Sequence, residues 1–532
     1  MSKIFNDVGV CFPEDHFMAD ISEKIDAIYK MVEKGNYFII NRPRQYGKTT
    51  VLFTLTDKLL ASDEYIPFKI SFEGISDRNF LDETLFAPGF VRLLANSIRS
   101  FDPNMATELR AKMPMLTNLD DLSDFITDVI EKTGKKVVLL IDEVDKSSNN
   151  QLFISFLGML RDKYLGRKGT ATFHSVILAG VHDIKSLKLK IRDDSESKYN
   201  SPWNIATKFK IDMNLTAAEI KPMLEDYVAE RGVKMDTEWV ANRLFFFTSG
   251  YPYLVSNLCK IIDEDILPQK KTQPDTVETT KEWTEEDVNQ AFNLILKEEN
   301  NANFDTLVKN LEQYPELYEL VFSLVFDSER KAYSSDNAVV NLGRLHGIFV
   351  ESEDGYIVIQ NRVYRERIAN MMISKWHTSH ANISSPAFSG SQYRLPNGGL
   401  DVEKALTNFQ VFMREQYSNK DRKFLERDGR LIFLAFLKPI LNGSGYEFKE
   451  PQVSDEKRLD IVITYNHFKY IVELKIWYGE VAHKKGLTQL ADYLERQSLQ
   501  TGYLLIFDHS KKKSWTKDWI EEAGKRIFWA RV

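Results

Sequence analysis

Glycine, lysine and two threonines follow an apolar run near the N-terminus in an order that suits the binding of a phosphate chain. Residues 37–40 form the apolar run, and the polar loop after them ends in Gly47, Lys48, Thr49 and Thr50. A buried strand, a tight loop and a helix start would point backbone N–H groups at a polyphosphate. The lysine would neutralise it, and a threonine hydroxyl would reach Mg²⁺. The pattern predicts a phosphate-binding loop.

This loop departs from the usual motif at its first position. Arg42 stands where the motif has glycine, five residues before Gly47, and Pro43 follows it. Proline fixes φ and could replace a flexible glycine at this point. The same four residues can also begin an ordinary helix, so a second motif is needed. The loop residues that we expect to contact a nucleotide are Pro43, Arg44, Gln45, Tyr46, Gly47, Lys48, Thr49 and Thr50.

A second motif lies about a hundred residues downstream. Residues 137–141 are five consecutive apolar residues, and Asp142 and Glu143 follow them. Such a run is typical of a strand buried on both faces of a parallel sheet, and ligands bind at the carboxyl ends of those strands. Asp142 would hold Mg²⁺ through water, Thr49 would reach the same ion with its hydroxyl, and Glu143 would polarise the attacking water. A solvated acidic turn is the alternative for this motif alone, but the two motifs together predict a site for ATP and Mg²⁺.

Length and composition bound the class of protein. A chain of 532 residues predicts three or four domains. A hydrophobic content of 43% and a charged content of 28% are typical of a soluble globular protein. Cys11 and Cys259 are the two cysteines, so we expect a reducing, cytoplasmic compartment. The chain shows neither a secretory signal pattern nor an apolar stretch that could span a bilayer, and no membrane partner is expected.

The charge is unevenly distributed along the chain. The net charge is −7, which argues against a protein that binds polyanions over its whole surface. From residue 401 onward, 23 Lys and Arg stand against 19 Asp and Glu, and the preceding part has 47 against 58. A mildly basic C-terminal domain on an acidic body permits local contact with nucleic acid.

Apolar strand-like segments alternate with helical ones through the first two hundred residues. Residues 65–72 and 174–181 are further strand candidates, and helices fill 80–133. This alternation predicts a mostly parallel sheet covered on both faces. The segments RPRQYGKTT, LLIDEVD, LAGVHDI, SPWNIA and GYPYLVSNLC, spread over residues 10–300, resemble the AAA-like ATPases of STAND-related families.

That resemblance implies further roles at single positions. His182 or Asp183 would be the polar sensor near the γ-phosphate, although a polar turn after a strand explains them equally well. Arg192 or Arg44 could be an arginine finger, with a solvated surface charge as the alternative. Trp203 is better explained as a packed core residue.

The predicted architecture is α/β and multidomain. A P-loop NTPase core occupies residues 1–212, a helical lid 213–302 and a winged-helix-like domain 303–376. Winged helices can read a DNA groove, but this one lacks a clear basic stripe and could serve packing or protein contact. Residues 377–400 are rich in Ser, Gly, Asn and Pro and predict a linker. An α/β domain fills residues 401–532.

A second set of chemical residues lies in this last domain. Residues 461–464 and 470–476 predict a strand hairpin, with Asp460 at its start and Glu473 and Lys475 on the returning strand. Side chains two apart on a strand share a face. Charges on an apolar strand are costly, so they usually pair or bind metal. Two carboxylates would suit Mg²⁺, and Lys475 could orient a metal-bound water. A salt bridge of Lys475 with Glu473 or Asp460 is the alternative.

The order of these residues resembles the PD-(D/E)XK nuclease superfamily over residues 410–510. A helix over 486–493 places Gln489 and Tyr493 on one face, and a final strand follows at 502–508. The resemblance implies a restriction-endonuclease-like domain in which Asp460 and Glu473 bind metal and Lys475 is catalytic. It assigns Gln489 and Tyr493 to the helix motif. Glu426 would be the first choice for the auxiliary acid, and Glu447 and Glu450 are weaker candidates. Leu459 stands where the family has proline.

The two sites together predict an ATPase module that governs a Mg²⁺-dependent nuclease. By resemblance, proteins of this build act in bacterial defence. The expected partners are nucleic acid, DNA first, and further copies of the same chain. One alternative is a STAND-like switch whose last domain holds nucleic acid without cutting it. Another is an ATP-driven motor, although no pore loop or helicase motif is visible.

Overall fold

The chain forms two compact units in a computed structural model. The first contains Met1–Asn310, Ser334–Val350 and Ile359–Tyr364, and the second contains Leu311–Tyr333, Glu351–Val358 and Arg365–Val532. None of the described helices is long and apolar enough to cross a membrane. The structure describes residues 2–147, 151–181, 203–271, 282–299, 301–326, 330–379, 390–416, 422–441, 461–465, 468–508, 510 and 513–532.

The first unit is built on a parallel sheet whose described strands run in the order β1-β4-β3-β2. Every adjacent pair is parallel. The central strands are buried along nearly their whole length, because their side chains are apolar on both faces. This confirms the predicted parallel sheet. The strands are β1 (Tyr37–Asn41), β2 (Tyr65–Ser71), β3 (Lys136–Asp142) and β4 (Ser175–Gly180).

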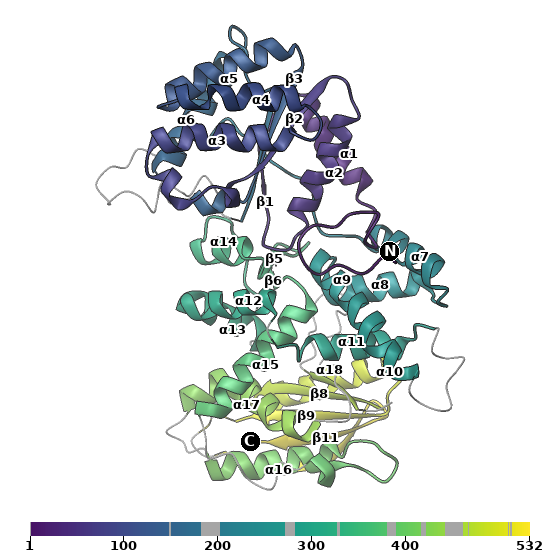
Figure 1. The fold of residues 1–532 in the computed structure, drawn as a ribbon. Helices are drawn as coiled ribbons and strands as arrows, with labels where there is room; N and C mark the ends of the chain where they lie inside the picture. Colours follow the sequence, from purple (N-terminus) through teal and green to yellow (C-terminus); the bar gives the residue numbers. More distant parts are fainter. Residues whose placement is uncertain are drawn as a thin grey trace. The chain divides into compact units, whose positions relative to one another are not determined.

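Helices cover both faces of this sheet, as Figure 1 shows with α1 and α2 on one side and α3 to α6 on the other. The core on the second side joins alternate residues of β1 and β3 to aromatic rings such as Phe86, Phe90 and Phe156. The helices are α1 (Ser22–Glu33), α2 (Lys48–Leu60), α3 (Glu83–Ile98), α4 (Pro103–Lys112), α5 (Leu119–Thr133) and α6 (Gln151–Gly166).

The predicted lid region is helical. Its first helix begins with a capping box between Thr216 and Glu219 and ends at Gly232 in a left-handed conformation. Gly250 is also left-handed, and a Cβ there would lie 1.8 Å from the carbonyl oxygen of Leu215, so only glycine fits. The helices are α7 (Ala217–Arg231), α8 (Thr237–Thr248), α9 (Pro252–Ile261), α10 (Leu267–Lys271) and α11 (Glu285–Ile295), with a π-helical turn at Ile262–Ile266.

Residues of the predicted winged-helix region contribute to both compact units. Their elements are α12 (Ala302–Gln313), α13 (Pro315–Phe326), α14 (Ala338–Leu345), β5 (Phe349–Glu351), β6 (Ile357–Ile359) and α15 (Arg362–Ser379). β5 and β6 form a two-stranded sheet. The assignment of this region as a winged helix stays a prediction. The predicted linker begins within α15 and ends at a bridge between Arg394 and Leu400.

The second unit carries a mixed five-stranded sheet in the order β10-β11-β9-β8-β7. β7 and β8 form the predicted antiparallel hairpin, and β9 runs parallel to β8. The prediction that the chain's last strand lies at 502–508 is wrong, because β10 and β11 follow it. The elements are α16 (Val402–Gln416), α17 (Arg422–Leu441), β7 (Ile461–Tyr465), β8 (Phe468–Ile476), α18 (Glu480–Arg496), β9 (Thr501–Phe507), β10 (Lys517–Glu522) and β11 (Lys525–Arg531).

Candidate nucleotide site and C-terminal acidic site

The polar loop between β1 and α2 turns through two left-handed residues. Gln45 has φ of 57°, and Gly47, which caps α2, has φ of 72°. A Cβ at Gly47 would meet no atom within 4 Å, so glycine is favoured there by backbone conformation and not by space. The loop ends at the N-terminus of a 13-residue helix, where unpaired N–H groups and the helix dipole favour an anion.

Lys48 lies buried at the start of α2, with 6% of its surface exposed. Its ammonium donates to the carbonyl oxygens of Arg42 at 2.9 Å and Pro43 at 2.7 Å. The lysine side chain therefore links the end of the loop to its first residues. Burial lowers the pKa of Lys48, and the charges of Glu143, Asp145 and Asp142 oppose that shift. The lysine therefore faces both the loop and the acidic end of β3.

The structure brings the two predicted motifs together. The Thr49 hydroxyl donates to Oδ2 of Asp142 at 2.6 Å, although 93 residues separate them. Asp142 is buried, and its other oxygen accepts from the backbone N–H of Glu143 at 2.9 Å. A hydroxyl and a buried carboxylate side by side are oxygen ligands of the kind that Mg²⁺ prefers.

Glu143 directly follows β3, and its backbone has a positive φ of 52°. Burial raises the pKa of Glu143 above its ordinary value, and the charge of Asp142 raises it further, while Lys48 acts in the opposite direction. A half-buried carboxylate with a raised pKa has the properties that a general base needs.

Asp145 was given no role from the sequence. Its carboxylate accepts a short hydrogen bond from the backbone N–H of Val181, just after β4. A Cβ at Gly180 would lie 2.9 Å from Oδ1 of Asp145. The DEVD segment therefore also fixes the end of the neighbouring strand. His182, Asp183 and Arg192 lie outside the described residues, so their predicted roles stay predictions.

Buried tyrosines contact the loop between β1 and α2 and help to fix it. The Tyr251 hydroxyl, at the start of α9, donates to the Arg44 carbonyl at 2.5 Å, and its ring meets that of Tyr46 edge-on at 4.5 Å. The Tyr46 hydroxyl donates to Asn214 at 2.8 Å and accepts from Gln360 at 2.9 Å.

A further pair of contacts extends this network. Asn303 donates to the Tyr251 hydroxyl at 3.1 Å and accepts from the Tyr364 hydroxyl at 2.7 Å. These residues are buried, so each polar group depends on its partner. Sequence reasoning missed Asn214, Asn303, Gln360 and Tyr364. It included Tyr251 only within the segment GYPYLVSNLC, without a role of its own.

The other loop residues that were predicted to contact a nucleotide differ in their exposure and contacts. Pro43 is buried, and a Cβ at Gly347 would lie 2.6 Å from its Cγ. Arg44 and Gln45 are exposed at the loop tip. The Thr50 hydroxyl accepts from the backbone N–H of Cys11 at 3.2 Å, which ties it to the N-terminal segment.

Trp203, which lies outside the loop, is fully buried, as expected of a packed core residue. The centre of its ring lies 6.0 Å from that of Tyr37.

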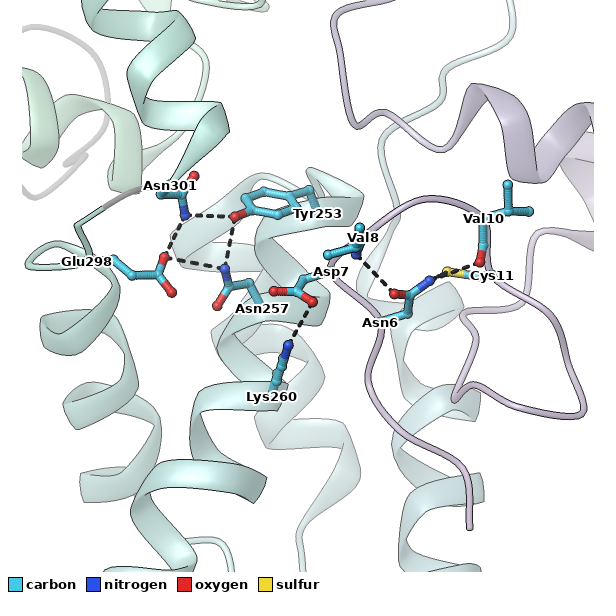
Figure 2. Close-up of polar contacts among 10 residues, drawn as sticks. All are labelled: Asn6, Asp7, Val8, Val10, Cys11, Tyr253, Asn257, Lys260, Glu298 and Asn301. Atoms are coloured by element: carbon cyan, nitrogen blue, oxygen red, sulfur yellow. Dashed lines mark hydrogen bonds and ion pairs between the residues drawn. The ribbon is translucent and has the colours of Figure 1, made fainter. Parts of the chain in front are cut away.

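The N-terminal segment is also tied to helix α9. Figure 2 shows Asp7 facing Lys260 of α9, with their charged atoms 2.8 Å apart. Nearby, the amide of Asn6 donates to the Val10 carbonyl at 2.9 Å. The segment that reaches Thr50 on α2 therefore also holds α9, the helix that begins directly after Tyr251.

The C-terminal acidic site is described in part. Glu473, with 3% of its surface exposed, forms an ion pair with Lys475 at 2.8 Å on β8. Ile461, which follows Asp460 in the sequence, pairs with Val472, the neighbour of Glu473. Asp460, Glu447 and Glu450 lie outside the described residues. Glu426 belongs to α17, but its side chain is not among those described.

The helix after β8 faces the ion pair. A Cβ at Gly486 of α18 would lie 3.7 Å from Cγ of Lys475. Gln489 is half-buried on the same helix. Tyr493 is buried, its hydroxyl has no hydrogen-bond partner in the described part of the chain, and burial raises its pKa to about 12. Among the described residues, no group of three or more His, Cys, Asp or Glu could hold a metal ion.

Comparisons with known proteins give the family. None of the curated proteins matches the chain. The RuvB Holliday junction branch migration motor of Thermotoga maritima is 16% identical, with a TM-score of 0.32, over 70% of this chain and 97% of that chain. The ORC2 protein of Aeropyrum pernix, in ADPNP-ADP complexes, is 12% identical, with a TM-score of 0.36, over 69% of this chain and 97% of that chain. The ORC1 protein of Aeropyrum pernix, in complex with DNA, is 11% identical, with a TM-score of 0.30, over 71% of this chain and 96% of that chain. The model of the AAA-like domain family matches residues 20–366, and the chain belongs to that family.

Proposed function

We propose that the first unit binds and hydrolyses ATP with Mg²⁺ at the loop that ends in Lys48. The observation that carries the proposal is the hydrogen bond of 2.6 Å between Thr49 and Asp142. It joins the two motifs that such a reaction needs, beside a buried lysine and a carboxylate with a raised pKa. Lys48 would neutralise the phosphates, Thr49 and Asp142 would hold Mg²⁺ directly or through water, and Glu143 would take a proton from the attacking water.

Replacing Thr49 tests the metal assignment. Thr49→Val keeps the shape of the side chain but removes the hydroxyl that faces Asp142. We expect the Mg²⁺ concentration for half-maximal ATPase activity to rise about tenfold or more, since a hydrogen bond to a charged group is worth roughly 1.5–3 kcal/mol. Thr54→Val is the matched control, because the Thr54 hydroxyl bonds only to the Thr50 carbonyl of its own helix among the described contacts. Equal Mg²⁺ dependence in the two variants would remove Thr49 from the metal site.

Tyr251 is expected to position the loop without touching the reaction. Tyr251→Phe removes the donor to the Arg44 carbonyl and leaves the ring against Tyr46. The change also removes the acceptor of the Asn303 amide, but only the bond to Arg44 reaches the loop. We expect the KM for ATP to rise by roughly 3- to 10-fold from the loss of that bond, with kcat less affected. Tyr253→Phe controls for loss of a buried hydroxyl two residues further on, because among the described contacts Tyr253 bonds to Asn257 and Asn301 and not to the loop. A KM that rises equally in both variants would argue for general loosening of α9.

We further propose that the second unit contains a PD-(D/E)XK nuclease domain that acts on nucleic acid, with DNA as the first candidate substrate. The nucleotide bound to the first unit would control its activity. Support comes from the hairpin of β7 and β8, the buried Glu473, and Lys475 beside it on the same strand. A buried carboxylate paired with a partly exposed lysine can hold a metal and orient its water. The ion pair itself fits the alternative of a structural salt bridge, so activity has to be measured.

The test incubates the purified chain with plasmid, linear and single-stranded DNA and with RNA. Each substrate is offered with and without ATP, and with Mg²⁺ or Mn²⁺. Nicked or shortened product that depends on the divalent ion supports the nuclease. Binding without product on every substrate favours the switch, in which the domain only holds nucleic acid. ATPase activity that nucleic acid stimulates in assembled rings would favour the motor. A role in bacterial defence depends on the nuclease result.

A further inference from the structure

A small cavity lies at the edge of the first sheet, beside β1. Residue Thr207 pairs in parallel with Phe38, and its N–H donates to the Tyr37 carbonyl at 2.8 Å. The segment around Thr207 therefore runs along the edge of β1 opposite to β4. The cavity, of about 160 Å³, is lined in part by Asn41 and Arg42 at the end of β1 and by Thr207, Lys208 and Phe209. Arg344 of α14 completes this wall.

The described lining of this cavity is strongly positive. Arg42, Lys208 and Arg344 all contribute to it, and none of the described lining residues is acidic. The guanidinium of Arg42 lies 5.6 Å from the centre of the Phe209 ring and donates to the carbonyls of Asn41 and Ile211. Arg344 is held by Asn341, to which it donates at 2.8 Å and 3.3 Å. These contacts fix the two guanidinium groups in place before any ligand arrives.

Arg42 and Arg344 line the same cavity, and their positive charges repel each other. The pKa of Arg42 is lowered mainly by burial and also by the charge of Arg344, with Tyr46 and the exposed Asp212 acting in the opposite direction. An anion bound between two positive charges at a cavity offsets their mutual repulsion. Arg42 has five N–H donors, of which the two carbonyl bonds use two.

The size and the donors of the cavity define the class of ligand. Pockets for drug-sized molecules measure roughly 300–1,000 Å³, so this one suits a single small group. Guanidinium forks match the oxygens of phosphate, and the Thr207 hydroxyl and Asn41 amide can complete its hydrogen bonds. Lys48, Thr49 and Asp142 do not line it. The site is thus separate from the proposed nucleotide site, although Arg42 borders both.

We propose that this cavity binds one phosphate group through Arg42, Lys208 and Arg344. The group can come from free phosphate or from the backbone of a nucleic acid strand, because both present the same oxygens. The proposal does not depend on ATP hydrolysis at the neighbouring loop.

Binding is measured on the full chain carrying Lys48→Ala, which removes the cation of the phosphate loop while the described residues that line the cavity keep their side chains. Calorimetric titrations use inorganic phosphate in one arm and a short single-stranded DNA in the other. The test variant adds Lys208→Gln and Arg344→Gln. The control adds Lys210→Gln and Lys234→Gln, two exposed residues that do not line the cavity, and so makes the same change in charge.

We expect the test variant to bind at least about tenfold more weakly than the control, from the loss of two charge-assisted contacts. A loss in the phosphate arm assigns free phosphate as ligand, and a loss confined to the DNA arm assigns a backbone phosphate. A charge-keeping variant, Lys208→Arg with Arg344→Lys, should retain binding in the same arm and so exclude misfolding. Equal affinity in test and control variants in both arms overturns the proposal, as does a parent chain that binds neither probe.

Discussion

Glu143→Gln is expected to lower the rate of ATP hydrolysis by about 10²- to 10⁴-fold, the usual range for loss of a general base, while ATP still binds. The glutamine keeps the shape of the side chain and cannot accept a proton from the attacking water. Lys48, Thr49 and Asp142 keep their contacts, so the substrate site is preserved. Single-turnover hydrolysis and equilibrium ATP binding, measured on the same protein, check both halves of this expectation.

The pH profile provides an independent signature of the same residue. Because burial and Asp142 raise the pKa of Glu143, the base is protonated at a pH where an exposed glutamate is still ionised. The acidic limb of kcat/KM should therefore lie at higher pH than the ordinary glutamate value of about 4.3, and it should disappear in Glu143→Gln. Glu64→Gln, at a surface ion pair with Lys136, should leave rate and profile unchanged. A normal rate in Glu143→Gln would remove Glu143 from the role of base.

Lys475→Ala is expected to abolish cleavage of nucleic acid, with a loss of at least about 10²-fold, the effect of removing one transition-state contact. ATP hydrolysis should persist at the wild-type rate, because Lys475 belongs to the second unit. The measurement follows nicking of plasmid DNA with Mg²⁺ alongside release of phosphate from ATP.

The control for Lys475→Ala tests whether loss of any lysine charge in this unit is enough to lower cleavage. Lys484→Ala removes an exposed lysine from α18 and should leave both activities intact. Removing Lys475 also leaves the buried Glu473 without this ion pair, so the melting temperature of each variant is measured too. Cleavage that persists in folded Lys475→Ala would make the ion pair structural and locate any nuclease chemistry elsewhere.

Local sequence pattern predicted the central part of the first unit well. The run at 137–141 is apolar at every position, which is typical of a strand buried on both faces, and β3 covers it. Thr49 and Asp142 meet because β1 and β3 flank β4 in a parallel sheet, so their carboxyl ends share one edge. The hairpin of β7 and β8 followed in the same way from two apolar runs around a polar turn.

Contacts between distant segments had no comparable signal. Gln360 reaches Tyr46 across 314 residues, and Tyr251 reaches Arg44 across 207. Each is an ordinary polar residue in its own segment, and only the packing of the helices brings the partners together. β10 was missed for another reason. Its sequence, KDWIEE, is that of an exposed edge strand, which shows no apolar alternation because it buries little.

Equilibrium binding of ATP to the full chain tests the central claim most directly. The titration is run with Mg²⁺ and with a chelator, on the wild-type chain and on Lys48→Ala. Saturable binding that weakens at least about tenfold both in Lys48→Ala and without Mg²⁺, as expected for loss of a charged phosphate contact, is the predicted result. Affinities that are the same in all four titrations, or no binding to the wild-type chain, would contradict a Mg²⁺-dependent ATP site at this loop.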